Sequence, residues 1–361
     1  MPKKKTYIIS GGGTGGHIYP AISIANELKK RHENADIFFV GAKGKMEMQK
    51  VPEAGFTIYG LWISGIQRKL SFKNLIFPFK LLSSLVKSWS ILRKHKPDAV
   101  VGVGGFASGP LLYMASRMKI PTAIQEQNGY PGITNKVLGR RVDKICVAFD
   151  GLEKYFPKSK IVITGNPTRD QIRKDLYTKD QARKHFDLDN DKKTLLIIGG
   201  SLGARSINEA ILYGIEKIES SGIQIIWQTG KSFQHEIEVA DGLRSEFIQE
   251  MGLAYTAADL VISRAGAISI SELCLMEKAT IFVPYPYAAE DHQTKNAKGL
   301  QEAGAAYIIA DDKAQSELVD LAIDLLAKPE ELENMEKKIK EFARPGAVSE
   351  IADIIDQLIE D

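Results

Sequence analysis

Short continuous apolar runs alternate with helix-like amphipathic stretches along the whole chain. Apolar character on consecutive residues, rather than on alternate ones, is typical of strands covered on both faces, as in a parallel sheet flanked by helices. The pattern therefore predicts an α/β protein with doubly wound sheets. The expected strands are 7–10, 36–40, 99–103, 122–125, 144–148, 161–164, 194–198, 224–228, 260–262, 280–283 and 306–309.

The order of strand, glycine-rich turn and helix occurs twice. It is found in "YIISGGGTGGHIYPA", residues 7–21, and again in "LLIIGGSLGARSINEAI", residues 195–211. Two such starts predict two Rossmann-like domains. The length of 361 residues agrees with this, because single cores seldom grow beyond roughly 250 to 300 residues.

The expected domain boundary lies in "TGNPTRDQIRKD", where glycine, asparagine and proline end a strand. We therefore expect an N-terminal domain over 1–165 and a C-terminal domain over 166–345. A last helix, about 346–361, follows a further break at Pro345 and Gly346. This helix could pack on either domain, and we assign it to the first.

The first turn matches the dinucleotide fingerprint G-x-G-x-x-G at Gly11, Gly13 and Gly16. A nicotinamide site also needs a carboxylate at the end of the second strand. That strand is followed by "GAK", residues 41–43, so a dinucleotide is disfavoured. The turn still offers bare backbone N–H groups to a negatively charged ligand.

His17 stands at the entrance of the helix that follows this turn, with a titratable ring beside the bare backbone. It is either a helix-start residue satisfied by the backbone or a functional residue of the site. The sequence alone leaves both readings open.

Composition limits the other possibilities. A net charge of +3 is too balanced for a general nucleic-acid binder. Cys146 and Cys274 lack metal or disulfide spacing, which favours a reducing cytoplasm. "DLDND", residues 187–191, matches the D-x-D of metal-dependent sugar transferases but lies before a strand, and we interpret it as a solvated turn. We expect no metal ion and no cofactor.

No Asp or Glu occurs between Glu53 and Asp98, whereas basic residues are frequent there. The segment 61–82 mixes aromatic and aliphatic residues with these cations, a composition suited to an anionic membrane surface. For the helix that follows, we expect the apolar stripe to face the core and the polar residues to be solvated. The expected core stripe is Phe79, Leu82, Val86 and Trp89, and the expected solvated residues are Lys80, Ser83, Ser84, Lys87 and Lys94.

Several motifs occur in an order that is specific as a set. They are "GGTGGHIYPA", "GGFASGP", "EQNGYPGITNK", "GNPTR", "GGSLGA" and "SRAGAISISEL" with "VPYPYAAEDHQTKNA". Over nearly the whole chain, this series resembles the peptidoglycan N-acetylglucosaminyltransferases of the MurG family. The resemblance implies the GT-B architecture, with two Rossmann-like domains facing across a cleft.

The implied activity is the inverting transfer of N-acetylglucosamine from UDP-N-acetylglucosamine to the muramyl 4-hydroxyl of lipid I, which gives lipid II. The implied location is peripheral, on the cytoplasmic face of the inner membrane. The implied partners are anionic lipid and proteins of cell-wall synthesis and division. Nucleic acid is not an expected partner. His17 is then the candidate base and Glu126 a weaker alternative.

The resemblance also implies a set of residues that bind UDP-N-acetylglucosamine. Some family members carry two glutamines where this chain has His292 and Gln293, so only the second is carried over. The implied binding residues are Thr14, Gly15, Gly16, Asn128, Arg169, Ser201, Ile248, Ala267, Ile268, Ser269, Ile270, Ser271, Glu272, Gln293 and Asn296.

Two other classes of function stay open at this stage. One is a different enzyme of the same architecture that acts on UDP-N-acetylglucosamine, such as a 2-epimerase. The other is a membrane-associated scaffold without activity.

Overall fold

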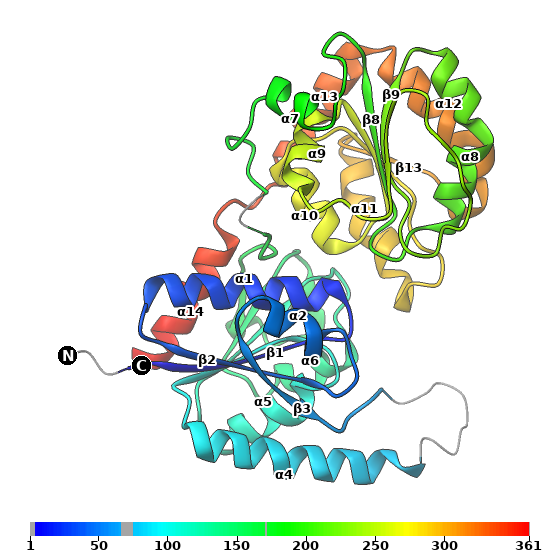
Figure 1. Ribbon diagram of the computed structural model, residues 1–361. Helices are drawn as coiled ribbons and strands as arrows, with labels where there is room; N and C mark the ends of the chain where they lie inside the picture. The colour runs from blue at the N-terminus through cyan, green and yellow to red at the C-terminus, as the bar shows by residue number, and fades with distance from the viewer. Residues whose placement is uncertain (1–3, 66–74, 170–171, 361) are drawn as a thin grey trace. The chain divides into compact units, whose positions relative to one another are not determined.

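The computed structural model describes residues 4–65, 75–169 and 172–360. By its internal contacts the chain divides into two compact units (Figure 1). Unit 1 comprises Met1–Arg169 and Gly346–Asp361, and unit 2 comprises Asp170–Pro345. Each contains one parallel sheet with helices on both faces, so the predicted pair of Rossmann-like folds is confirmed.

Unit 1 has a seven-stranded sheet in the order β3-β2-β1-β4-β5-β6-β7. Its strands are β1 (Thr6–Gly11), β2 (Asp36–Ala42), β3 (Thr57–Leu61), β4 (Ala99–Gly104), β5 (Thr122–Glu126), β6 (Lys144–Val147) and β7 (Ile161–Ile163). Its helices are α1 (Gly15–Arg31), α2 (Glu47–Glu53), α4 (Phe77–His95), α5 (Ser108–Arg117), α6 (Ile133–Gly139) and α14 (Ala347–Glu360), with short 3₁₀ turns η1 (Leu152–Lys154) and η2 (Lys158–Lys160).

Unit 2 has a six-stranded sheet in the order β10-β9-β8-β11-β12-β13. Its strands are β8 (Thr194–Ile198), β9 (Gln224–Gln228), β10 (Gly242–Ser245), β11 (Leu260–Ser263), β12 (Thr280–Phe282) and β13 (Tyr307–Ile308). Its helices are α7 (Lys179–His185), α8 (Arg205–Ser220), α9 (Met251–Ala257), α10 (Ala267–Leu275), α11 (His292–Glu302), α12 (Ala314–Leu326) and α13 (Pro329–Lys340), with 3₁₀ turns η3 (Ala289–Asp291) and η4 (Asp311–Lys313).

Each sheet separates two hydrophobic layers, because successive strand side chains point to opposite faces. In unit 1, Tyr7 and Ile9 of β1 lie in the core formed with α1 and α14, whereas Ile8 lies in the core formed with α4 and α5. Figure 1 shows these helix pairs on opposite faces of the sheet. In unit 2, Leu195 packs on the side of α8 and α12, and Leu196 on the side of α9 and α10.

Unit 1 extends four residues beyond the expected boundary at Gly165, as far as Arg169. Asn166 explains the extension, because its side chain joins the end of β5. The Gln125 Nε2 donates to Asn166 Oδ1 at 3.0 Å, and the Asn166 Nδ2 donates to the Gln127 carbonyl at 3.2 Å.

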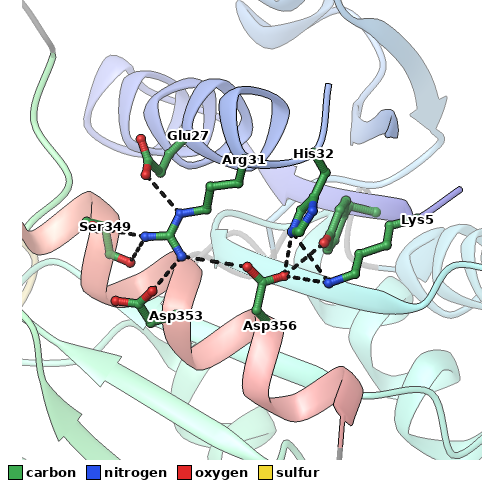
Figure 2. A network of polar contacts seen from close by, with 8 residues as sticks. Lys5, Glu27, Arg31, His32, Ser349, Asp353 and Asp356 are labelled. Atoms are coloured by element: carbon green, nitrogen blue, oxygen red, sulfur yellow. Dashed lines mark hydrogen bonds and ion pairs between the residues drawn. The ribbon is translucent and has the colours of Figure 1, made fainter. Parts of the chain in front are cut away.

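The last helix, α14, packs on α1 within unit 1. Figure 2 shows that the Asp356 carboxylate points toward Lys5 and His32. The His32 Nε2 lies 2.8 Å and the Lys5 Nζ 3.1 Å from Asp356 Oδ1. Burial raises the pKa of Asp356, but the contacts with His32 and Lys5 outweigh burial and hold that pKa below its ordinary value. The ionised carboxylate therefore stabilises the packing of α14.

Asp356→Asn should loosen α14 at neutral pH. Because the pKa of Asp356 is lower in the folded than in the unfolded state, its contribution is complete above about pH 4 and disappears as the pH falls through the folded-state value. We expect exchange of α14 amide hydrogens to be about 5- to 30-fold faster at pH 7, which corresponds to about 1–2 kcal/mol. The difference between the variant and the parent should shrink steadily as the pH is lowered below about 4. Asp353→Asn is the control, since the Asp353 side chain is 57% exposed, and an equal effect there would contradict the assignment.

The expected core stripe of α4 is wrong. Its four apolar residues face solvent, with exposed fractions of 69% for Phe79, 62% for Leu82, 59% for Val86 and 42% for Trp89.

The buried face of α4 combines the small residues Ser84 and Ser88 with the apolar residues Ile91 and Leu92. Ser84, expected to be solvated, is 1% exposed, and its hydroxyl donates to the Trp62 carbonyl at 3.2 Å. Lys80 is partly buried and donates to the Ser64 hydroxyl at 2.9 Å. Lys87 is exposed, as expected, and donates to the Gly60 carbonyl at 2.8 Å. These contacts turn the helix so that its apolar stripe points outward. Ser83 and Lys94 are also exposed, as expected.

Candidate functional site

In unit 1 the candidate residues gather at the carboxyl ends of β1, β4 and β5, which are neighbours in the sheet. The first turn joins β1 to α1, and His17 lies in the first helical turn. The His17 Nδ1 is 3.0 Å from the Gly12 carbonyl oxygen. A carbonyl only accepts, so Nδ1 carries the proton in this contact and the basic lone pair resides on Nε2. The backbone contact expected of a helix-start histidine is thus present, and the tautomer that it selects is compatible with a base.

The turn after β4 packs directly on this histidine. A Cβ atom at Gly104 would lie 2.7 Å from His17 Nε2, and one at Gly105 would lie 2.6 Å from the Gly12 carbonyl oxygen. Both glycines have positive φ, 103° and 91°. Side chains at either position would displace the imidazole or the first turn.

Glu126 ends β5 and is 2% exposed. Its carboxylate accepts hydrogen bonds from the Asn128 and Gly132 backbone N–H groups at 3.0 and 3.1 Å, and from the Asn135 Nδ2 at 2.9 Å. Both oxygens are thus engaged in holding the loop from β5 to α6. This arrangement favours a role for Glu126 in positioning Asn128 rather than as a base.

The remaining candidate residues of unit 1 lie at the same edge of the sheet. Thr14 and Gly16 are exposed and Gly15 is partly exposed, so their backbone can be approached from solvent. Arg169 lies at the end of unit 1, and its guanidinium carbon is 5.8 Å from the ring centre of Tyr19 in α1. The structure therefore brings Arg169 to the first turn.

In unit 2 the second glycine turn joins β8 to α8, and Ser201 is exposed on it. Gln228 at the end of β9 is buried and ties this turn to Ile248. Its Nε2 donates to the Gly200 carbonyl at 3.2 Å, and its Oε1 accepts from the Ile248 N–H at 3.0 Å. The Ile248 side chain itself is only 4% exposed.

The segment 267–272 forms the first part of α10 after β11. Ala267, Ile270 and Glu272 are buried, and Ile268, Ser269 and Ser271 are partly buried. The helix begins at Ala267 with Gly266 as its N-cap, and the N-terminus of a helix favours negative charge. The Tyr255 hydroxyl donates to Glu272 Oε2 at 3.1 Å and orients that carboxylate.

Gln293 and Asn296 lie in the first turns of α11. The Gln293 Oε1 accepts from the Tyr285 N–H at 2.9 Å, and Asn296 is 4% exposed. His292 is partly buried on the same helix. These contacts fix Gln293 against the segment after β12.

Two polar residues that hold these turns were missed by the sequence analysis. Glu47 accepts hydrogen bonds from the first turn, and Arg264 after β11 bonds the Val283 carbonyl at 3.0 Å and Asp311. The signal for Arg264 was its place in "SRAGA", whereas nothing in the sequence placed Glu47 near the first turn.

Within the described ranges there is no group of three or more His, Cys, Asp or Glu that could hold a metal ion. In the D-x-D segment, the Asp189 carboxylate accepts from the Asp191 N–H at 2.8 Å, as in a local turn.

Models of known domain families match residues in both units. A model of the glycosyltransferase family 28 N-terminal domain matches residues 7–147, and one of the corresponding C-terminal domain matches residues 194–358. A Flavobacterium psychrophilum protein is 51% identical over 98% of each chain, and one from Phocaeicola vulgatus is 50% identical over 98% of this chain and 96% of its own. Both are named UDP-N-acetylglucosamine--N-acetylmuramyl-(pentapeptide) pyrophosphoryl-undecaprenol N-acetylglucosamine transferase.

Solved structures agree with these relatives. Acinetobacter baumannii MurG aligns with a TM-score of 0.74 and 27% identity, covering 98% of this chain and all of its own. A Neisseria meningitidis UDP-GlcNAc 2-epimerase aligns at 0.67 with 14% identity over 98% of this chain and all of its own, which shows a shared fold alone. Given relatives with about half their residues identical along almost the full length, the chain belongs to glycosyltransferase family 28 and, within it, to the MurG family of N-acetylglucosaminyltransferases.

Proposed function

We propose that this protein transfers N-acetylglucosamine from UDP-N-acetylglucosamine to the muramyl 4-hydroxyl of lipid I. The observation that carries the proposal is the 51% identity, over nearly the whole chain, with a relative named for this reaction. The product would be lipid II, a precursor of peptidoglycan. The same identity favours transfer over the epimerase and scaffold alternatives, since the epimerase shares only 14% of its residues.

We assign the base to unit 1 and the donor nucleotide mainly to unit 2. In the reaction the acceptor oxygen forms a bond to the anomeric carbon as the bond from that carbon to the UDP oxygen breaks. The acceptor proton would pass to His17 Nε2, the nitrogen left basic by the Nδ1 contact with Gly12. Charge developing on UDP would be stabilised by Arg169, Ser201 and the N-terminus of α10.

The unit 2 contacts support an assignment of the donor. We propose that Glu272, held by Tyr255, accepts the ribose hydroxyls, and that Gln293 and Asn296 bind the sugar. Gln228 would shape the uracil side by holding Ile248 against the second glycine turn.

One assay separates the three classes of function. The purified protein is incubated with UDP-N-acetylglucosamine and a short-chain lipid I analogue, and the products are identified by mass spectrometry. We expect a disaccharide product and UDP. Epimerisation or hydrolysis without transfer would favour another enzyme, and an absence of any product would favour a scaffold.

We further propose that the protein binds the cytoplasmic face of the membrane peripherally. In the described part of the chain, no helix has the length and apolarity needed to cross a bilayer. The support comes from α4, whose outward stripe of Phe79, Leu82, Val86 and Trp89 lies on a helix without acidic residues. The Arg93 guanidinium carbon lies 5.0 Å from the Trp89 ring centre, so cations flank the apolar surface. The residues Arg68, Lys69 and Lys73 of the predicted membrane segment lie outside the described residues.

Removing apolar area from α4 should release the protein from vesicles. For the double variant Phe79→Ser and Leu82→Ser, we expect the partition coefficient onto anionic vesicles, measured by flotation, to be at least about tenfold lower. The reason is that each apolar side chain buried in the membrane contributes about 1.5–3 kcal/mol. Tyr213→Ser is the control, since Tyr213 is 76% exposed on α8 of unit 2. Flotation that is equal with anionic and neutral lipid would exclude the proposed electrostatic part.

A further inference from the structure

Glu47 places a buried carboxylate against the first glycine turn. It is the first residue of α2 and is 1% exposed. Its Oε2 accepts from the Gly13 N–H at 2.9 Å, and its Oε1 accepts from the Ala42 N–H at 2.9 Å. One side chain thus joins the ends of β1 and β2, at the position where a dinucleotide enzyme would hold a ribose.

The space for this carboxylate is created by two glycines. A Cβ atom at Gly12 would lie 2.3 Å from the Glu47 carboxyl carbon, and one at Gly41 would lie 2.5 Å from its Cγ. Neither position tolerates a side chain while Glu47 stays in place. Gly12 is therefore required by the packing of an acidic side chain.

Gly12 and Gly13 share one peptide group, and both ends of that group are engaged. Its N–H donates to Glu47, and its carbonyl accepts from His17 Nδ1 at 3.0 Å. A negative charge at the N–H end polarises the peptide and makes its carbonyl a stronger acceptor, because consecutive hydrogen bonds reinforce one another in a site of low dielectric. The imidazolium formed when His17 takes a proton is stabilised by that carbonyl.

We infer that Glu47, the Gly12–Gly13 peptide and His17 form a hydrogen-bonded relay, in which the Glu47 carboxylate orients His17 and stabilises its protonated form. Glu47 is a positioning residue, since it acts through the peptide and not on the substrate. The inference deepens the proposed function and rests on it for the role of His17 as the base.

Other charged and titratable groups lie near the first glycine turn and are the same in the parent and in E47Q. Tyr19 of α1 interacts electrostatically with Lys50 of α2, and Arg169 lies over its ring. Lys50 in turn pairs with Glu53 at 2.7 Å. Glu53→Gln therefore removes the same charge from the same helix without touching the turn.

The first test follows the titration of His17 by NMR in the parent, E47Q and E53Q proteins. We expect His17 to be protonated on Nδ1 when neutral, and its pKa to be roughly 0.5–1 unit lower in E47Q but unchanged in E53Q. E47D keeps the charge on a shorter side chain and should give a smaller shift than E47Q. A neutral His17 protonated on Nε2 in the parent protein would overturn the relay, even if E47Q does not fold.

The second test measures transfer with the short-chain lipid I analogue. E47Q should lower kcat by about 10- to 100-fold with little change in the KM for UDP-N-acetylglucosamine, and the acidic limb of its pH profile should move to lower pH. Folded E47Q with the kcat and pH profile of the parent would overturn the inference, as would equal losses in E47Q and E47D with an unmoved limb. If the parent itself transfers no sugar, the proposed function fails, whereas the NMR titration still decides whether the relay exists.

Discussion

His17→Ala is expected to lower the kcat of transfer by about 10²- to 10⁴-fold, the usual contribution of a general base. The imidazole is the group that the first turn orients, with Nδ1 on the Gly12 carbonyl and Gly104 packed at Nε2. Because the donor nucleotide is assigned to unit 2, the affinity for UDP should change little. Steady-state kinetics give kcat, and titration calorimetry gives the dissociation constant of UDP.

The matched control is His235→Ala, which removes an exposed histidine of unit 2. It should leave both constants close to those of the parent. A His17→Ala protein that keeps near-normal turnover would remove His17 from the role of base. A loss of UDP affinity as large as the loss of turnover would instead indicate a role in donor binding.

Glu272→Gln is expected to raise the KM for UDP-N-acetylglucosamine by about 10- to 100-fold. A carboxylate can accept from both ribose hydroxyls, whereas an amide offers one oxygen, and a hydrogen bond to a charged group contributes about 1.5–3 kcal/mol. Because Glu272 is 3% exposed, the loss cannot be compensated readily by solvent. The kcat at saturating donor should fall much less, since the ribose is remote from the reacting carbon.

Tyr255→Phe tests whether the Tyr255 hydroxyl orients Glu272 for binding the ribose. It removes the hydroxyl that donates to Glu272 Oε2 and should raise the donor KM by about 3- to 10-fold, less than the change at Glu272. Thermal unfolding of both variants separates binding from folding. If a deoxyribose-containing donor distinguishes the parent from Glu272→Gln as strongly as the natural donor does, Glu272 does not bind the ribose.

Among the described residues, the sequence predicted the interior strands of both sheets and the edge strands β7 and β13, but it missed the edge strands β3 and β10. Strands in the middle of each sheet are continuous apolar runs, so their pattern is independent of tertiary context. The two strands that were missed, β3 and β10, each pair with a single neighbour, β2 and β9. β10 reads "GLRS" and alternates exposed and partly exposed residues, so its extended form depends on pairing with β9 and leaves little signal in the sequence.

The helix α4 shows a different limit of pattern reading. Its periodicity correctly indicated an amphipathic helix but not which face is buried. Ser84 and Ser88 lie on the buried face together with Ile91 and Leu92, whereas the stripe from Phe79 to Trp89 is exposed. A hydrophobic stripe therefore does not by itself identify the face of a helix that packs on the protein.

Some site residues could be recognised from the sequence, and others could not. The glycine turns and His17 stand out because their residue types are local to a strand end. Glu47 does not, because its contact with Gly13 joins residues 34 apart through a strand, and burial of a carboxylate has no sequence signature. The expectation that no carboxylate reaches the end of the second strand was correct for residues 41–43 but overlooked one that arrives from α2.

The return of α14 to unit 1 affects the order in which the chain can fold during synthesis. Ile351 and Ile355 lie in the same core as Tyr7 and Phe39, yet the ribosome makes them after all of unit 2. A nascent chain of the first 169 residues therefore leaves uncovered the apolar side chains on which α14 packs, whereas unit 2 is contiguous and can fold without a later segment. Chaperones that hold apolar surface should engage unit 1 for longer than unit 2, and a ribosome stalled before residue 346 should carry a protease-sensitive N-terminal unit.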